Sequence, residues 1–183
     1  DPEMTKRNWK TLEQDFVFAA DPYVRVARET VELPDGTVID DFYQVHLRPF
    51  VSVVPITPDG RVLILDQYKH GPRCVSITFP GGFVDEGEVP EEAGRRELME
   101  ETGFRAGTFI PLGAYVDNGN QRGCSGTYFL ALDCEKVAEA DPGDLEDMEV
   151  SFATPAELDA ALGTPRFAIT HMAAAWAFAR MKL

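Results

Sequence analysis

Short apolar runs broken by turn sequences fill the first half of the chain, and they constrain its fold more than any other feature. Over residues 16–47 apolar and polar residues alternate in places, and Pro34-Asp35-Gly36 separates two of these runs as a hairpin turn does. Further runs predict strands at residues 50–57, at 62–65 as the returning strand after a Pro58-Asp59-Gly60 turn, and at 75–79, 108–116, 126–133 and 150–152. The chain is therefore expected to fold around a β-sheet.

Helical patterns interrupt these strands once and then close the chain. Pro90 suits the first turn of a helix, Glu91 and Glu92 favour its positive end, and Gly103 is a typical C-terminal stop. Two later helices are expected at residues 155–162 and 169–182. With 183 residues the chain is long enough to bury a full core. The order of elements predicts the α/β (α+β) class, a mixed sheet packed with helices.

The chain is strongly acidic, with 31 Asp and Glu against 17 Lys and Arg and a net charge of −14. This charge opposes nucleic acid as a partner, because binding to phosphates needs clustered Lys and Arg. No apolar run approaches the roughly 20 residues of a membrane span, and the polar start is unlike a signal peptide. Cys74, Cys124 and Cys134 are widely spaced and are expected to be reduced thiols. A cytoplasmic protein without a membrane partner is therefore expected.

Two short stretches hold most of the negative charge. Residues 85–101 carry eight acids against two arginines, and residues 135–149 carry seven acids against one lysine, so each stretch has a net charge of −6. Solvated faces are the ordinary explanation of such runs. A divalent cation site is the alternative, because hard cations prefer carboxylate oxygens.

The helix expected at residues 90–102 carries carboxylates where a core-facing stripe is usual, since Leu98 and Met99 are its only large apolar residues. At about 100° per residue, Glu100 and Glu101 lie about 60° to one side and about 40° to the other side of Glu97. Like charges at this spacing repel one another. A bound cation would reverse that effect and use all three groups.

The spacing of the residues around this helix is more specific than its charge. The pattern consists of Gly82, Glu88, Arg96-Glu97-Leu98, Glu100-Glu101 and Gly103-Phe104, with gaps of five, seven, one and one residues. It resembles the Nudix box of the nucleoside diphosphate-linked hydrolases at every defined position. The resemblance implies a Nudix-type α/β/α sandwich with a mixed sheet and an N-terminal antiparallel strand extension. The expected division is an extension over residues 1–47 and a hydrolase domain over residues 48–183.

The resemblance also implies roles for individual residues. The family cleaves a diphosphate linked to another group X, by water attack at phosphorus and with Mg²⁺ or Mn²⁺. By this match Glu97, Glu100, Glu101 and the carbonyl of Gly81 would hold the metal. Arg96 and Glu88 would form a pair that orients the metal carboxylates, with Gly82 beside them. An exposed loop acid is the alternative for Glu88.

Outside the box the sequence resembles, more loosely, the ADP-ribose pyrophosphatase branch of ADP-sugar hydrolases. Gln67-Tyr68-Lys69 stands where the branch has Gln-Tyr-Arg, so Lys69 is a candidate contact to the diphosphate, although it lacks the bidentate fork of arginine. The proline that the branch carries beyond the box is absent near residues 117–120. Arg122 is the only cation of that loop and a second candidate contact. A solvated side chain is the alternative for both.

The branch further implies a late carboxylate and an assembly. Glu146 is the best match for an additional metal ligand or water-activating base, with Asp144 and Glu149 as alternatives. The N-terminal strands would exchange between the subunits of a homodimer. The expected substrate is a nucleotide sugar such as ADP-ribose. A dinucleotide or coenzyme as X, and a nucleotide-sugar-sensing module without turnover, stay open as alternatives.

Overall fold

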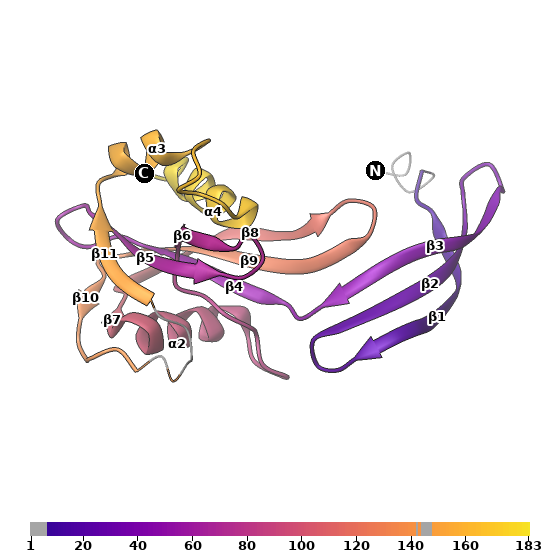
Figure 1. Ribbon diagram of the computed structural model, residues 1–183, viewed down its shortest axis with the longest axis horizontal. Helices are drawn as coiled ribbons and strands as arrows, with labels where there is room; N and C mark the ends of the chain where they lie inside the picture. The colour runs from indigo at the N-terminus through magenta and orange to yellow at the C-terminus, as the bar shows by residue number, and fades with distance from the viewer. Residues whose placement is uncertain (1–6, 142, 144–147) are drawn as a thin grey trace. The chain divides into compact units, whose positions relative to one another are not determined.

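The computed structural model describes residues 7–141, 143 and 148–183 (Figure 1). The chain divides into two compact units. Unit 1 comprises Asp1–Arg48 and Val116–Ser125, and unit 2 comprises Pro49–Tyr115 and Gly126–Leu183. Within the described ranges, the helices are too short or too polar to cross a membrane.

Unit 1 is built on a three-stranded antiparallel meander. Its strands are β1 (Lys10–Ala20), β2 (Val24–Glu32) and β3 (Val38–Leu47). The predicted turn joins β2 to β3, where Gly36 adopts a φ of +86° and the amide of Leu33 donates to the carbonyl of Thr37 at 2.8 Å. Left-handed backbone of this kind favours glycine, so the turn explains the Pro-Asp-Gly signal.

A hairpin tip from the middle of the chain joins unit 1. It is formed by the end of β8 (Thr108–Asn118) and the start of β9 (Arg122–Leu132). The side-chain oxygen of Asn118 accepts the amides of Asn120 and Gln121, both at 2.8 Å, which closes the turn. The carbonyl of Gln121 accepts the amide of Val45 at 2.9 Å, and β9 begins parallel to β3. The expected boundary at residue 47 did not include this tip.

Unit 2 contains two larger sheets, a short ladder and the helices. In the first sheet β4 (Phe50–Pro55) runs parallel to β9, and β8 pairs with β9 on the other side. The second sheet has the order β11 (Met148–Ala153), β5 (Val62–Lys69) and β6 (Cys74–Thr78), with antiparallel neighbours. The remaining elements are the ladder of β7 (Phe104–Arg105) with β10 (Glu135–Lys136), and helices α2 (Pro90–Thr102), α3 (Pro155–Ala161) and α4 (Thr170–Arg180).

Helices cover both faces of these strands, as Figure 1 shows, so the predicted α/β/α sandwich is confirmed. Alternate residues of one strand serve opposite layers. On β5, Val62 and Ile64 pack in the cluster that contains Trp176 of α4, whereas Leu63 and Leu65 pack in the cluster that contains Leu98 of α2. The strands are therefore buried on both faces, which explains their continuous apolar runs.

One expectation about strand order was wrong. The strand beginning at Val62 was expected to return beside the strand that ends near Thr57, but the two share only one isolated bridge, between Ile56 and Val62. From there β5 enters the second sheet and pairs with β6 and β11. A turn signal cannot distinguish a hairpin from a change of sheet, because both need the same local backbone.

Helix α2 has the predicted bounds, and its buried face explains the missing apolar stripe. Gly103 ends the helix with a φ of +74°, and its amide donates to the carbonyl of Met99 at 2.8 Å. The buried residues are small or few, namely Ala93, Gly94, Leu98 and Thr102. A Cβ at Gly94 would lie 3.1 Å from Val53 and 3.2 Å from Phe109. The helix therefore packs by close approach to its sheet, and the carboxylates of Glu97, Glu100 and Glu101 lie beside this buried face.

Candidate active site

Arg96 connects acidic side chains of α2 with the loop before the helix. Its Nε and Nη2 donate to the two carboxylate oxygens of Glu88 at 2.9 and 3.0 Å, a bidentate pair. Its Nη1 donates to Glu97 at 2.7 Å and to Glu100 at 3.1 Å. These partners raise the pKa of Arg96, with the hydrogen bond to Glu88 as the main cause. One guanidinium thus holds three carboxylates in a fixed arrangement.

Glu88 connects this cluster to the loop before the helix. The amide of Asp85 donates to its carboxylate at 3.0 Å, and the carbonyl of Phe83 accepts from Arg96 at 3.2 Å. The side chain of Glu88 is only 16% exposed, so an exposed loop acid does not describe it. The hydrogen bond from Arg96 is the main cause that lowers the pKa of Glu88. The hydrogen bonds of the Asp85 amide to Glu88 and of Arg96 to the Phe83 carbonyl were not predicted, because backbone groups leave no signal in a sequence.

Glu97 is more buried than Glu91 and Glu100, whose side chains are each 48% exposed. Its side chain is 14% exposed, and burial raises its pKa even though Arg96 acts in the opposite direction. It lies against the backbone of Gly82, where a Cβ would come within 2.6 Å of the carboxylate carbon. Any larger residue at position 82 would displace Glu97. The glycine therefore serves close packing against the carboxylate.

Gly81 contacts the third carboxylate. Its amide donates to Glu101 at 2.9 Å. A Cβ at this position would collide with the carbonyl of Val51, and the carbonyl of Gly82 accepts the amide of Val51 at 2.9 Å. Neither glycine has a positive φ. Close approach to β4 and to the helix, rather than left-handed backbone, is the reason for Gly81-Gly82.

The donor set of this face has the chemistry of a hard-cation site. Glu97, Glu100 and Glu101 supply carboxylate oxygens, the ligands that Mg²⁺ and Mn²⁺ prefer. Over residues 7–141, 143 and 148–183 no three Asp, Glu, His or Cys side chains already form a closed metal cluster. Instead Arg96 and the Gly81 amide hold these carboxylates. The residue types fit a divalent cation. Among the described residues, Arg96 is the one cationic side chain seen to contact the buried carboxylate of Glu97.

The other predicted site residues lie elsewhere or outside the description. Lys69 is half-buried at the end of β5 in unit 2, opposite Cys74. Arg122 is exposed at the hairpin tip of unit 1, with a φ of +64°. Glu149 is exposed on β11, opposite Asp66. Asp144 and Glu146 are not among the described residues. The structure thus brings together the residues of the box, which belong to unit 2. Arg122 belongs to unit 1.

Two family models match the chain, and together they cover most of it. The model described as NUDIX domain matches residues 46–171, which include the glycine loop and all of α2. The model described as nucleoside diphosphate sugar hydrolase N-terminal domain matches residues 9–45, which are β1, β2 and most of β3.

Individual proteins are similar over shorter segments. An ADP-ribose pyrophosphatase of Bacillus subtilis is 30% identical over 109 residues, which are 58% of this chain and 56% of that protein. An RNA pyrophosphohydrolase of Caulobacter vibrioides is 52% identical over 56 residues, 31% of this chain and 32% of that protein. The chain thus spans about a third of one of these relatives and somewhat more than half of the other. A crystal structure of ADP compounds hydrolase matches the fold with a TM-score of 0.79 at 22% identity, over 96% of this chain and 94% of that one.

Proposed function

Because this chain belongs to the NUDIX domain family, whose model matches residues 46–171, we propose that it is a pyrophosphohydrolase that requires a divalent cation. It cleaves the diphosphate of a nucleoside diphosphate linked to X, by attack of water at phosphorus. The observation that carries this proposal is the acidic face of α2, where Arg96 and the glycine loop hold Glu97, Glu100 and Glu101.

The electrostatics of the site explain why a cation is needed. A diphosphate is anionic and would be repelled by three carboxylates on a protein of net charge −14. Glu97, Glu100, Glu101 and the Gly81 carbonyl would hold Mg²⁺ or Mn²⁺. The cation supplies neutralisation of the diphosphate and a more acidic attacking water. Arg96 keeps Glu97 and Glu100 in place, and Glu88 in turn orients Arg96 through the bidentate pair.

We further propose that a carboxylate outside α2 completes the site by accepting the proton of the attacking water. Glu146 is the first candidate, with Asp144 and Glu149 as alternatives. A general base must reach the water in the formed complex, so a single-turnover comparison of Glu146→Gln, Asp144→Asn and Glu149→Gln assigns it. The variant that lowers the rate of the chemical step most, without loss of cation binding, identifies the base.

A nucleotide sugar such as ADP-ribose is the proposed substrate. The match of residues 9–45 to the nucleoside diphosphate sugar hydrolase N-terminal domain supports this choice, and so does the similarity to an ADP-ribose pyrophosphatase. The test is a panel with Mg²⁺ that follows release of monophosphates from ADP-ribose, other nucleotide sugars, NADH, diadenosine compounds and 5′-triphosphorylated RNA. Turnover of ADP-ribose in Mg²⁺, abolished by excess chelator, is expected. Unchanged turnover in chelator would contradict the cation requirement.

Two cationic side chains are proposed contacts to the substrate, Lys69 and Arg122. Arg122→Ala is expected to raise KM and to change the ranking among nucleotide sugars, because charge-assisted hydrogen bonds select strongly. Arg61→Ala, a loss of an exposed arginine on the β4–β5 turn, is the control. If three nucleotide sugars keep their KM values and their order in Arg122→Ala, this residue does not select X.

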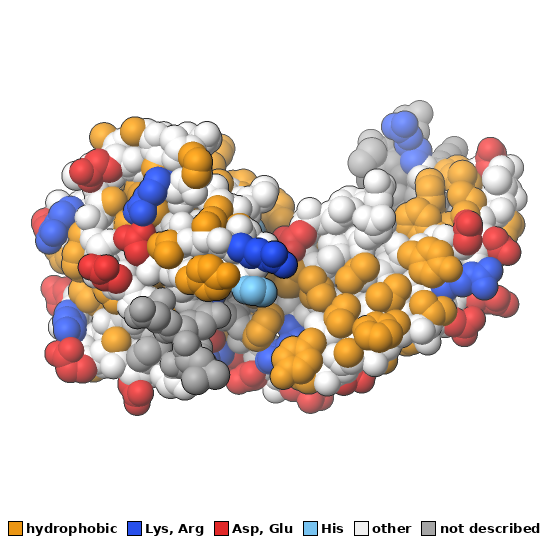
Figure 2. All heavy atoms as spheres, in the orientation of Figure 1, with side chains coloured by type: hydrophobic (Ala, Val, Ile, Leu, Met, Phe, Trp, Pro, Cys, Tyr) orange, Lys and Arg blue, Asp and Glu red, His pale blue; other side chains and the backbone are white. Residues whose placement is uncertain are grey.

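A homodimer formed through unit 1 is the proposed assembly. Strand β1 lies at the edge of its sheet, and its residues from Lys10 to Ala19 are all exposed. Figure 2 shows hydrophobic side chains gathered over the strands of unit 1. The exposed large apolar residues among the described part of this unit are Trp9, Leu12, Phe16, Val17, Phe18, Tyr23, Val38, Tyr43, Leu47 and Val116. An apolar surface and an open sheet edge together favour a protein partner. The three free cysteines support the cytoplasm as its compartment.

A further inference from the structure

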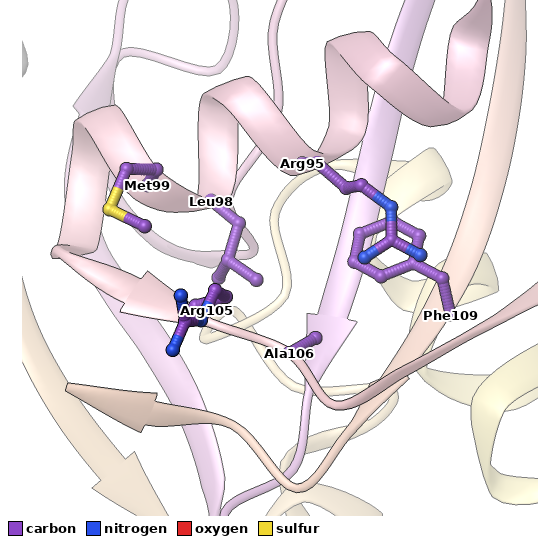
Figure 3. A pocket seen from close by; sticks show the side chains of 6 residues that line it. All are labelled: Arg95, Leu98, Met99, Arg105, Ala106 and Phe109. Carbon is purple, nitrogen blue, oxygen red and sulfur yellow. The ribbon is translucent and has the colours of Figure 1, made fainter. Parts of the chain in front are cut away.

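A cavity lies on the back of α2, away from the carboxylates. Its volume is about 230 Å³, and it is lined by Arg95, Leu98, Met99, Arg105, Ala106 and Phe109 (Figure 3). Residues 95 and 99 lie about 160° to either side of Glu97 around the helix, at about 100° per residue. The cavity therefore does not belong to the face that carries the proposed hydrolase site.

The floor of this cavity is apolar and its shape is held by packing. Leu98 is 1% exposed and belongs to the core, and Phe109 packs on the core residue Phe129 with ring centroids 5.4 Å apart. Figure 3 shows Leu98 and Met99 projecting from the helix above Arg105 and Ala106. At about 30 Å³ per molecule of liquid water, a volume of 230 Å³ corresponds to roughly eight water molecules. It suits a compact organic ligand better than a large one.

Two arginines stand at this apolar floor, and they differ in their partners. The guanidinium of Arg95 lies over the ring of Phe109, 4.3 Å from its centroid, and pairs with Glu91 at 2.8 Å. Arg95 is thus held in place and partly neutralised. Arg105 is exposed, and within the described ranges it makes no ion pair; Glu135 stands opposite it in the β7–β10 ladder. Among the described residues, the charge of Arg105 is therefore open to a ligand.

We propose that this cavity is a binding site for a small organic carboxylate with a compact apolar body. The body would lie on Leu98, Met99 and Phe109, and the carboxylate would take the charge of Arg105, with the fixed guanidinium of Arg95 beside it. A single negative charge suits the site better than the double charge of a phosphate, because Glu91 and Glu135 lie nearby on a protein of net charge −14. The proposal does not depend on hydrolase activity.

The test is a titration of the full chain, carrying ¹³C-methyl methionine, with benzoate as the probe. The methyl resonance of Met99 is expected to shift with saturation, and that of Met181, which is 84% exposed, is expected to stay in place. Met99→Leu assigns the resonance. Benzamide, which has the ring without the charge, and acetate, which has the charge without the ring, are each expected to bind at least about tenfold more weakly.

Two variants separate the parts of the site. Arg105→Gln is expected to weaken benzoate at least about tenfold, and Arg61→Gln, which removes a guanidinium paired with Asp59 and placed over Phe152, is expected to leave it unchanged. Ala106→Leu fills the cavity while keeping both arginines and should abolish binding. The unshifted resonances of the other methionines report that each variant is folded. Equal affinity for benzoate and benzamide, tighter binding of phenyl phosphate than of benzoate, or unchanged binding in Arg105→Gln and Ala106→Leu would each overturn the proposal.

Discussion

Units 1 and 2 both contain strands rich in apolar residues, but these side chains are mostly exposed in unit 1 and mostly buried in unit 2. In unit 2 the residues from Val62 to Leu65 are buried without interruption, because helices lie on both sides of the strands. In unit 1 the buried apolar side chains of the described residues are Ala27, Val31 and Cys124. Unit 2 therefore carries a complete core of its own, whereas the described strands of unit 1 expose most of their large apolar side chains. The comparison predicts that unit 2 determines stability and chemistry and that unit 1 determines association.

The largest effect is expected from the core of unit 2. Trp176 is fully buried and its indole N–H donates to Asp159 at 3.0 Å. Trp176→Ala should lower the free energy of unfolding by about 3–5 kcal/mol, through lost burial and a residual cavity. Tyr23→Ala in unit 1, made in a Phe18→Lys background that removes the proposed dimer, should change it by less than about 0.5 kcal/mol, because the side chain is 72% exposed. Urea titrations of both variants test the contrast, and similar losses in the two would contradict it.

The next effect concerns the carboxylate face of unit 2. Glu101→Gln should lower kcat/KM at least about a hundredfold, near the cost of losing one strong electrostatic group. Its fold should survive, because the side chain lies outside both core clusters. Glu92→Gln, an exposed change in the first turn of the same helix, is the matched control and should keep normal turnover. Near-normal turnover in Glu101→Gln would place the site elsewhere.

Association should respond to unit 1 and not to unit 2. The chain has a mass of 20.3 kDa, so light scattering at micromolar concentration should give about twice that value. Phe18→Lys places a charge on an exposed edge strand and should return the mass to that of one chain. Val75→Lys, an equally exposed apolar strand residue of unit 2, should leave the dimer intact. A single-chain mass for the unaltered protein would reject the dimer.

The smallest effect compares a buried thiol of each unit. Burial raises the pKa of Cys124 in unit 1 to about 11 and that of Cys134 in unit 2 to about 12. The thiolate is the reactive form, so at pH 8 Cys124 should be labelled about tenfold faster than Cys134. Cys74 should be labelled faster than either, because it is less buried. Local opening of a unit with few buried residues acts in the same direction.

Labelling followed by mass spectrometry measures the order of the three thiols. Raising the pH from 8 to 9 should accelerate the labelling of both buried thiols about tenfold. At a pH below the pKa, each rise of one pH unit increases the thiolate fraction about tenfold. Cys134 labelled as fast as Cys124 would show that the two units open alike.

Local signals predicted much of the fold and of the site. The bounds of α2 follow from Pro90 and Gly103, whose preferences act within a few residues, and the structure reproduces them. The spacing of the box predicted the family, which the match to residues 46–171 confirms. The helical period predicted that Glu97, Glu100 and Glu101 share one face, and Arg96 and Gly81 reach them there.

Long-range pairing decided what local signals leave open. The turn after Thr57 was interpreted as a hairpin, yet β5 pairs with β6 and β11. The tip at residues 116–125 joins β3 through hydrogen bonds from residues more than 70 positions away in the sequence. The ladder of β7 with β10 consists of two residues on each side and had no sequence signal.

The amino-acid sequence by itself determined the family, the acidic helix and its turn residues, because these depend on residue type and on spacing within about one element. Tertiary structure decided which sheet each strand enters, that Gly82 must accommodate the carboxylate of Glu97, and that Arg95 and Arg105 meet at one cavity. The physical reason is that a side chain's burial and partners depend on segments that are distant in the chain, and pairing between such segments is set by the packing of the whole core.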